Sequence, residues 1–320
     1  MSRNLRAGHW KPVAAIFVAL LLAACSTPGP QRPTDPDIAA AAKRGQRAFR
    51  GGRYEAAAEA YAAALHRARM LNEKTGAADS AYNLAACLVA LNRFEEARAA
   101  LRETRSELAP GDPGLADVLL LEGAIARGQG RRDDALALAD QVLALKMPEP
   151  GGAARKLQAH LLRAETGCDG GEAAWEYSDL AAAMRAASDE RTPPGLRAAA
   201  FAADGRILRM QRDWTAAAAR YDAAAEQYRR AARPRDVAEM LALAGRCFEE
   251  AGAPAAAADR YYRAARSFYA QNDFAMAVKT LDSAFAMAEK ANDPELKSRS
   301  EDLLREVKAA VKAAQAGIGK

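Results

Sequence analysis

Small apolar residues recur at helical spacing through most of the chain, from Ile38 onward. Side chains three and four residues apart lie on one face of an α-helix. One clear apolar stripe consists of Phe274, Ala277, Val278, Leu281, Ala284, Phe285 and Ala288. Lys279, Asp282 and Glu289 fall off this stripe. Applied along the chain, the pattern predicts fourteen helices, near 38–50, 54–72, 76–91, 94–107, 113–128, 132–146, 152–165, 172–188, 194–211, 214–231, 235–251, 254–271, 273–291 and 294–316.

A set of five positions repeats along this helical region, and it combines small and aromatic residues. The offsets are identical in three copies, Gly45-Tyr54-Ala57-Tyr61-Ala64, Gly205-Trp214-Ala217-Tyr221-Ala224 and Gly245-Pro254-Ala257-Tyr261-Ala264. Weaker copies are Gly123-Arg132-Ala135-Ala139-Val142 and Ala85-Phe94-Ala97-Leu101-Thr104. The small first residue lets two helices approach, and the aromatic residue opens the second helix after a turn. The alanine that follows sits where the helices cross most closely. The fourteen helices therefore pair into about seven hairpins.

This pattern resembles the tetratricopeptide repeat family over most of residues 38–316. The resemblance implies an all-α, right-handed superhelical solenoid, with residues 317–320 as a tail. Equivalent alanines recur at intervals of 38 to 40 residues in this sequence, whereas the family period is about 34. Longer helices or wider connections are therefore expected. Residues 146–195 fit the repeat poorly and are predicted to be a degenerate repeat, with a turn over residues 167–171.

The resemblance also implies a ligand groove, because stacked hairpins form a concave surface from the first helix of each pair. Residues on that face contact peptide or helix ligands in the family. The matching positions here are Gln46, Phe49, Asn83, Arg127, Arg206, Arg209 and Arg246. The four arginines would suit an acidic segment of a partner protein. The alternative is that they only solubilise an alanine-rich surface.

The N-terminus has the organisation of a secretory signal peptide. Arg3, Arg6 and Lys11 precede thirteen uncharged residues that are mostly apolar, and this order is typical of export signals. Thirteen helical residues reach roughly 20 Å, which is too short for a hydrocarbon core of about 30 Å. Residues 1–24 are therefore predicted to be removed on export.

Leu22, Ala23, Ala24 and Cys25 resemble the lipobox of bacterial lipoproteins. The resemblance implies that the thiol of Cys25 receives a diacylglycerol group and anchors the chain in a membrane. Ser26, where aspartate would favour the inner membrane, implies the periplasmic face of the outer membrane. Residues 25–37 then form a proline-rich tether.

The charged residues exclude an obvious role in nucleic-acid binding. The chain has 46 basic and 41 acidic side chains, and the leader takes three of the basic ones. The remainder is nearly neutral, without the basic excess of a nucleic-acid-binding protein. Cys87, Cys168 and Cys247 are widely spaced and are interpreted as small buried hydrophobic residues.

No constellation of catalytic or metal-ligating residues is present in the sequence. His66 and His160 stand alone, and the glycine pairs lie at expected turns. We therefore expect no enzyme activity, no cofactor and no metal.

Two functional hypotheses follow from these observations. The first is a membrane-anchored periplasmic scaffold or assembly factor that binds another cell-envelope protein, as in outer-membrane or pilus and secretion assembly. The alternative is a regulator of peptidoglycan synthesis or remodelling, contacting a cell-wall enzyme or glycan. A weaker third possibility is that the solenoid dimerises.

Overall fold

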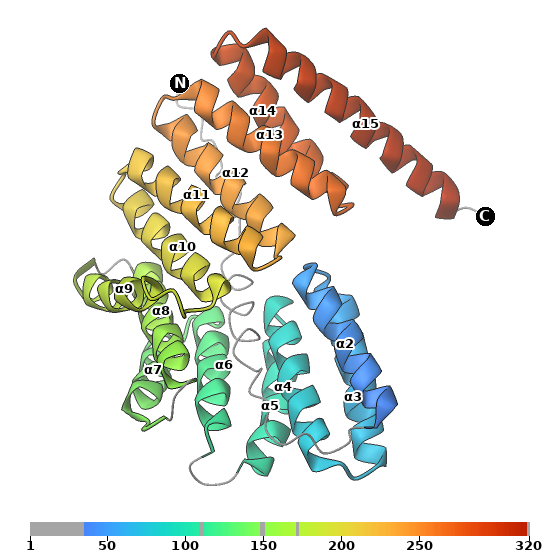
Figure 1. Ribbon diagram of the computed structural model, residues 1–320, viewed down its shortest axis with the longest axis vertical. Helices are drawn as coiled ribbons and strands as arrows, with labels where there is room; N and C mark the ends of the chain where they lie inside the picture. The colour runs from blue at the N-terminus through green and yellow to red at the C-terminus, as the bar shows by residue number, and fades with distance from the viewer. Residues whose placement is uncertain (1–34, 109–111, 148–150, 171–172, 319–320) are drawn as a thin grey trace.

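The computed structural model describes residues 35–108, 112–147, 151–170 and 173–318 of the 320-residue chain. These ranges contain fourteen α-helices and no strand (Figure 1). The helices are α2 (Pro36–Arg50), α3 (Tyr54–Met70), α4 (Lys74–Ala90), α5 (Phe94–Glu107), α6 (Gly114–Gly128), α7 (Arg132–Ala144), α8 (Gly152–Gly170), α9 (Ala173–Ala187), α10 (Pro194–Met210), α11 (Trp214–Arg230), α12 (Pro234–Glu250), α13 (Pro254–Ala270), α14 (Phe274–Lys290) and α15 (Pro294–Ile318). The predicted all-α repeat solenoid is confirmed.

The lipobox residues Leu22, Ala23, Ala24 and Cys25 lie outside the described residues, as does Ser26. Helix α2 begins at Pro36, slightly earlier than expected, because Asp35 caps it. The Asp35 carboxylate accepts hydrogen bonds from the backbone N–H groups of Asp37 and Ile38 at 3.0 and 3.3 Å. An aspartate N-cap followed by proline in the first turn is a strong helix start. None of the described helices has both the length and the apolarity that a membrane span requires.

Most consecutive helices are joined by a three-residue turn with its middle residue in the left-handed region. This residue is glycine or asparagine at most turns of the described chain, and Arg212 or Ala232 at two others. The full set is Gly52, Asn72, Asn92, Gly130, Arg212, Ala232, Gly252, Asn272 and Asn292. Within residues 52–92 and 212–292 these turns are 20 residues apart. One hairpin therefore takes 40 residues, which explains why the sequence period exceeds that of a typical tetratricopeptide repeat.

The repeated small and aromatic positions form the contact between the two helices of a hairpin. A Cβ atom on Gly205 would lie 3.2 Å from the Tyr221 ring, and one on Gly245 would lie 3.0 Å from the Tyr261 ring. The alanines after the aromatic position are buried completely, at Ala57, Ala97, Ala135, Ala217, Ala257 and Ala277. Small side chains therefore set the distance between the helices, as the sequence predicted.

The degenerate region folds as a further pair of helices, α8 and α9, but the turn predicted over residues 167–171 is wrong for residues 167–170, and residue 171 lies outside the described ranges. Helix α8 continues to Gly170. Cys168 is buried in the core, and the Asp169 carboxylate accepts hydrogen bonds from Arg127 and Arg206. These contacts with α6 and α10 stabilise a helical turn that the local glycines alone would not favour.

The array curves so that its first hairpin returns to a later one. The α2–α3 hairpin at the blue end lies beside the start of α12 (Figure 1). The Arg235 side chain packs on Gly52, where a Cβ atom would collide with Cδ of Arg235. Tyr54 is buried next to this point, and its pKa is raised first by burial and then by Asp236 and Glu239. We call Gly52 and Tyr54 with residues 233–239 the closing contact.

Candidate functional site

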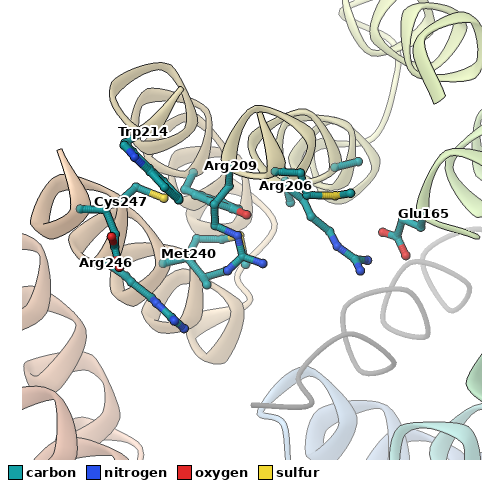
Figure 2. Close-up of a pocket in the computed structure, with 13 residues that line it drawn as sticks. Glu165, Arg206, Arg209, Trp214, Met240, Arg246 and Cys247 are labelled. Carbon is teal, nitrogen blue, oxygen red and sulfur yellow. The ribbon is translucent and has the colours of Figure 1, made fainter. Parts of the chain in front are cut away.

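A pocket at the predicted groove lies between helices α10 and α12, the first helices of consecutive hairpins. Its volume is about 500 Å³, within the range of ligand pockets. Arg206 and Arg209 of α10 and Arg246 of α12 line it, together with Trp214 and Met240 (Figure 2). Three of the four arginines proposed from the sequence are therefore brought together.

The repeat explains why these arginines meet. Arg206 and Arg246 occupy the same repeat position and are one 40-residue period apart. Arg209 lies about one turn after Arg206 on the same face of α10. Stacking of successive hairpins therefore places all three side chains around one space.

The fourth arginine, Arg127, is buried and contacts other residues of the solenoid. Its side chain is only 6% exposed, and it forms ion pairs with Glu165 and Asp169 of α8. Asp169 also pairs with Arg206, at 2.6 Å between Oδ1 and Nη2. Arg127 thus binds neighbouring hairpins together, and its assignment to a ligand surface is not supported.

Arg209 and Arg246 differ from Arg206 because neither forms an ion pair with any side chain of the described residues. Arg246 is exposed, and Arg209 is half-buried. Arg206 is held by Asp169, yet its Nη1 atom is buried and has no hydrogen-bond acceptor in the described part of the chain. The pocket therefore presents the guanidinium donors of Arg209 and Arg246, which an acceptor from outside would satisfy.

The Cys247 thiol, which also lines the pocket, lies in the electrostatic field of both guanidinium groups. Burial raises its pKa to about 11, and Arg209 and Arg246 both act in the opposite direction. A positive charge lowers the pKa of a nearby thiol because it stabilises the thiolate. Figure 2 shows Arg209 and Arg246 extending from different helices, with Met240 between them.

An apolar wall completes the pocket. Met240 is buried, Trp214 and Leu243 are half-buried, and Met210 is 44% exposed at the rim. Trp214 was not among the groove residues predicted from the sequence, where it was placed only at the start of a second helix. Its repeat position, the first residue of α11 directly after the turn, places it next to the end of α10 and was the available signal.

The remaining predicted groove residues are not part of this pocket. Gln46 is exposed on α2. Phe49 is 6% exposed and packs edge-on against Tyr54, with ring centroids 5.1 Å apart, so its assignment to a groove is wrong. Asn83 donates from Nδ2 to the backbone carbonyl of Asp79 at 2.8 Å.

The histidine with a carboxylate partner has a structural role. His160 Nδ1 lies 2.9 Å from Oδ1 of Asp179, and Nε of Arg163 donates to Oδ2 of the same carboxylate at 2.8 Å. These contacts join α8 to α9. The three cysteines in the described ranges, Cys87, Cys168 and Cys247, are buried and free of disulfides, as interpreted from the sequence.

Comparison with known proteins agrees with this architecture. Residues 42–113, which span α2 to α5, match the tetratricopeptide repeat family. No curated protein matches the chain in sequence. The solved Rap protein complexed with Competence and Sporulation Factor is 14% identical, with a TM-score of 0.52 over 85% of this chain and 76% of that one. That likeness concerns the fold.

Two further solved structures resemble the chain less closely. A tetratricopeptide repeat protein from Parabacteroides merdae ATCC 43184 is 14% identical, with a TM-score of 0.40 over 85% of this chain and 99% of that one. The APC/C hetero-tetramer Cut9-Hcn1 is 13% identical, with a TM-score of 0.44 over 78% of this chain and 48% of that one.

Proposed function

We propose that this chain is a lipid-anchored scaffold or assembly factor of the bacterial cell envelope, whose solenoid binds another protein. The observation that carries the proposal is the pocket between α10 and α12, where Arg209 and Arg246 have no acidic partner in the described chain. Helical-repeat arrays bind partners on surfaces built by successive repeats. The solved protein of similar fold named above is itself complexed with a separate factor.

The proposed location rests on the sequence alone. A basic leader, a short apolar segment and Leu22 to Cys25 support export followed by lipidation. Ser26 supports the periplasmic face of the outer membrane. The proline-rich segment before α2 would hold the solenoid near the membrane while leaving its pocket accessible.

Cross-linking in the native host tests the protein-binding function. A photo-crosslinking amino acid is placed at position 209 or 246, and as a matched control at position 102, an exposed arginine of α5 that lines a different pocket. We expect a discrete protein adduct from positions 209 and 246 and none from 102. If the pocket positions gave no adduct, or the same adducts as position 102, the pocket would not be the binding surface.

The peptidoglycan alternative predicts a different result. A direct glycan-binding role requires the purified protein to sediment with protein-free peptidoglycan. We expect no such co-sedimentation, because the pocket has a single accessible tryptophan and is dominated by guanidinium groups. Strong sedimentation that Trp214→Ala abolishes would favour the alternative.

A further inference from the structure

Some of the arginine side chains that line the pocket have an acidic partner, and others have none in the described chain. Among the described residues, Arg127 pairs with Glu165, and Arg206 pairs with Asp169. Glu250 lies at the rim and forms no ion pair with Arg209 or Arg246 in the described chain. Two guanidinium groups without an ion-pair partner in the described chain therefore line one pocket, and like charges that share a site repel. An anionic group between them would remove this repulsion.

The geometry of guanidinium groups narrows the choice of anion. Arginine presents a planar fork of N–H donors that matches a carboxylate, and charge-assisted hydrogen bonds of this type are stronger than neutral ones. Arg209 of α10 and Arg246 of α12 both line this pocket. A carboxylate would therefore find donors from both α10 and α12.

The apolar wall adds a second requirement for the ligand. Met210 and Trp214 are partly exposed beside the arginines, and Met240 forms the floor between them (Figure 2). A volume of about 500 Å³ exceeds what one carboxylate needs. A bulky apolar group bound against this wall would also exclude water from the ion pair and strengthen it.

We propose that the pocket binds an acidic side chain of a partner protein that stands directly beside a bulky apolar side chain. This inference rests on the proposed protein-binding function and names the chemistry of its partner. The carboxylate lies between Arg209 and Arg246, and the neighbouring leucine, methionine, phenylalanine or tryptophan packs on Trp214 and Met240.

The test is selection from a bead-displayed library of random nonapeptides by the purified full-length protein. We expect enrichment of aspartate or glutamate next to a bulky apolar residue. Arg209→Gln and Arg246→Gln should each weaken binding of the best peptide by about tenfold. Replacing the peptide's acidic residue by its amide should weaken binding to the same extent, and the two changes should not be additive.

A matched control is available in a second pocket of similar volume, about 510 Å³, between α5 and α7. The double variant Arg98→Gln/Arg102→Gln removes two positive charges there, one more than either single pocket variant, and should change the affinity by less than about twofold. Circular dichroism verifies that every variant remains helical.

The possible outcomes distinguish a failure of this inference from a failure of the proposed protein-binding function. Enrichment of peptides that lack an acidic residue, or acidic peptides whose binding is unchanged in Arg209→Gln and Arg246→Gln, would overturn the inference and leave a protein-binding function. Displacement of the peptide by millimolar free glutamate would overturn it in favour of a small-acid site. No enrichment by the folded wild-type protein would contradict both.

Discussion

A Cβ atom on Gly45 would lie 2.8 Å from Cε2 of Tyr61, closer than two such carbon atoms approach without displacement. Tyr61 is 3% exposed, so its ring has no solvent to move into. The same glycine–tyrosine contact recurs between Gly205 and Tyr221 and between Gly245 and Tyr261. Close packing of the first helix on the second in these hairpins therefore depends on the absence of a side chain at one position.

Gly45→Ala should accordingly lower the free energy of unfolding by about 1–2 kcal/mol, because overpacking outweighs the better helix propensity of alanine. The midpoint of urea unfolding, followed by circular dichroism, measures this loss. Gly51→Ala is the control, since the nearest heavy atom to its Cβ would lie 3.5 Å away. A Gly45→Ala protein as stable as wild type would contradict the packing argument.

Ala232 has φ of +53° in the turn between α11 and α12. Residues with a Cβ atom are strained in this region, whereas glycine is not. Ala232→Gly should therefore raise the free energy of unfolding by about 0.5–1 kcal/mol. Ala231→Gly, at a neighbouring position with φ of −80°, should lower it, because there glycine only adds freedom to the unfolded chain. Thermal unfolding of the two variants should shift in opposite directions.

The helices and their pairing were predictable because the relevant signals are local and repeated. Alanine stripes, turn glycines and asparagines, and the glycine–tyrosine spacing each occur within one hairpin. The period also placed Arg206 and Arg246 on neighbouring first helices. Their meeting around one pocket followed from the repeat alone.

The sequence predictions failed where contacts between residues distant in the sequence outweigh the local sequence pattern. Residues 167–171 resemble a turn, but Asp169 forms ion pairs with Arg127 and Arg206, each about 40 residues away. Phe49 matched a groove position, yet its ring is covered by Tyr54. Contacts of this kind depend on curvature and side-chain direction, which a repeat pattern does not specify. The closing contact of Gly52 with Arg235, across most of the chain, is the extreme case.

Asp169 should be important for stability because it joins α8 to both α6 and α10. Although burial acts to raise its pKa, Arg127 and Arg206 hold that pKa below the ordinary value of 3.8. The ionised form therefore stabilises the fold above this value, and the contribution is lost as the pH falls through the lowered pKa. Asp169→Asn should lower stability at pH 7 by about 1–2 kcal/mol, allowing for solvent screening.

The difference between wild type and Asp169→Asn should shrink when unfolding is measured near pH 3. Asp302→Asn is the control, since Asp302 is exposed and pairs with Arg305 only within α15. That exposed pair should contribute less than about 0.5 kcal/mol. If both variants lost the same free energy of unfolding, the ion pairs of Asp169 between helices would stabilise the fold no more than an exposed pair within one helix.

The membrane anchor makes a separate prediction about Cys25. If a lipid on this thiol is the attachment, Cys25→Ser should move the protein from the membrane fraction to the soluble fraction after cell lysis. The released protein should still be folded, because position 25 is not part of any of the described helices. Metabolic labelling with a fatty-acid analogue should be lost in the same variant. Continued membrane association of Cys25→Ser with unchanged folding would rule out the lipid as the anchor.

The closing contact should respond to pH through Glu239. This side chain is 13% exposed and pairs with Arg235 at 3.2 Å. Its pKa is raised to about 7, first by burial and then by Asp236, against the opposite effects of Arg235 and Arg233. A raised pKa means that the protonated form fits the fold better. Stability is therefore greatest below the ordinary value of 4.5 and decreases as the pH rises through 7.

Glu239→Gln should remove this decrease, so that the variant is more stable than wild type at pH 8 by about 1–3 kcal/mol and equal to it near pH 4. Because Glu239 lies beside Tyr54, hydrogen exchange over residues 49–54 should also slow in the variant at pH 8. Glu226→Gln, on an exposed surface of α11, should show neither effect. A wild-type free energy of unfolding that does not change between pH 5 and 8 would contradict the role of Glu239. Hydrogen exchange that slows throughout the chain in the variant would contradict a local effect on the closing contact.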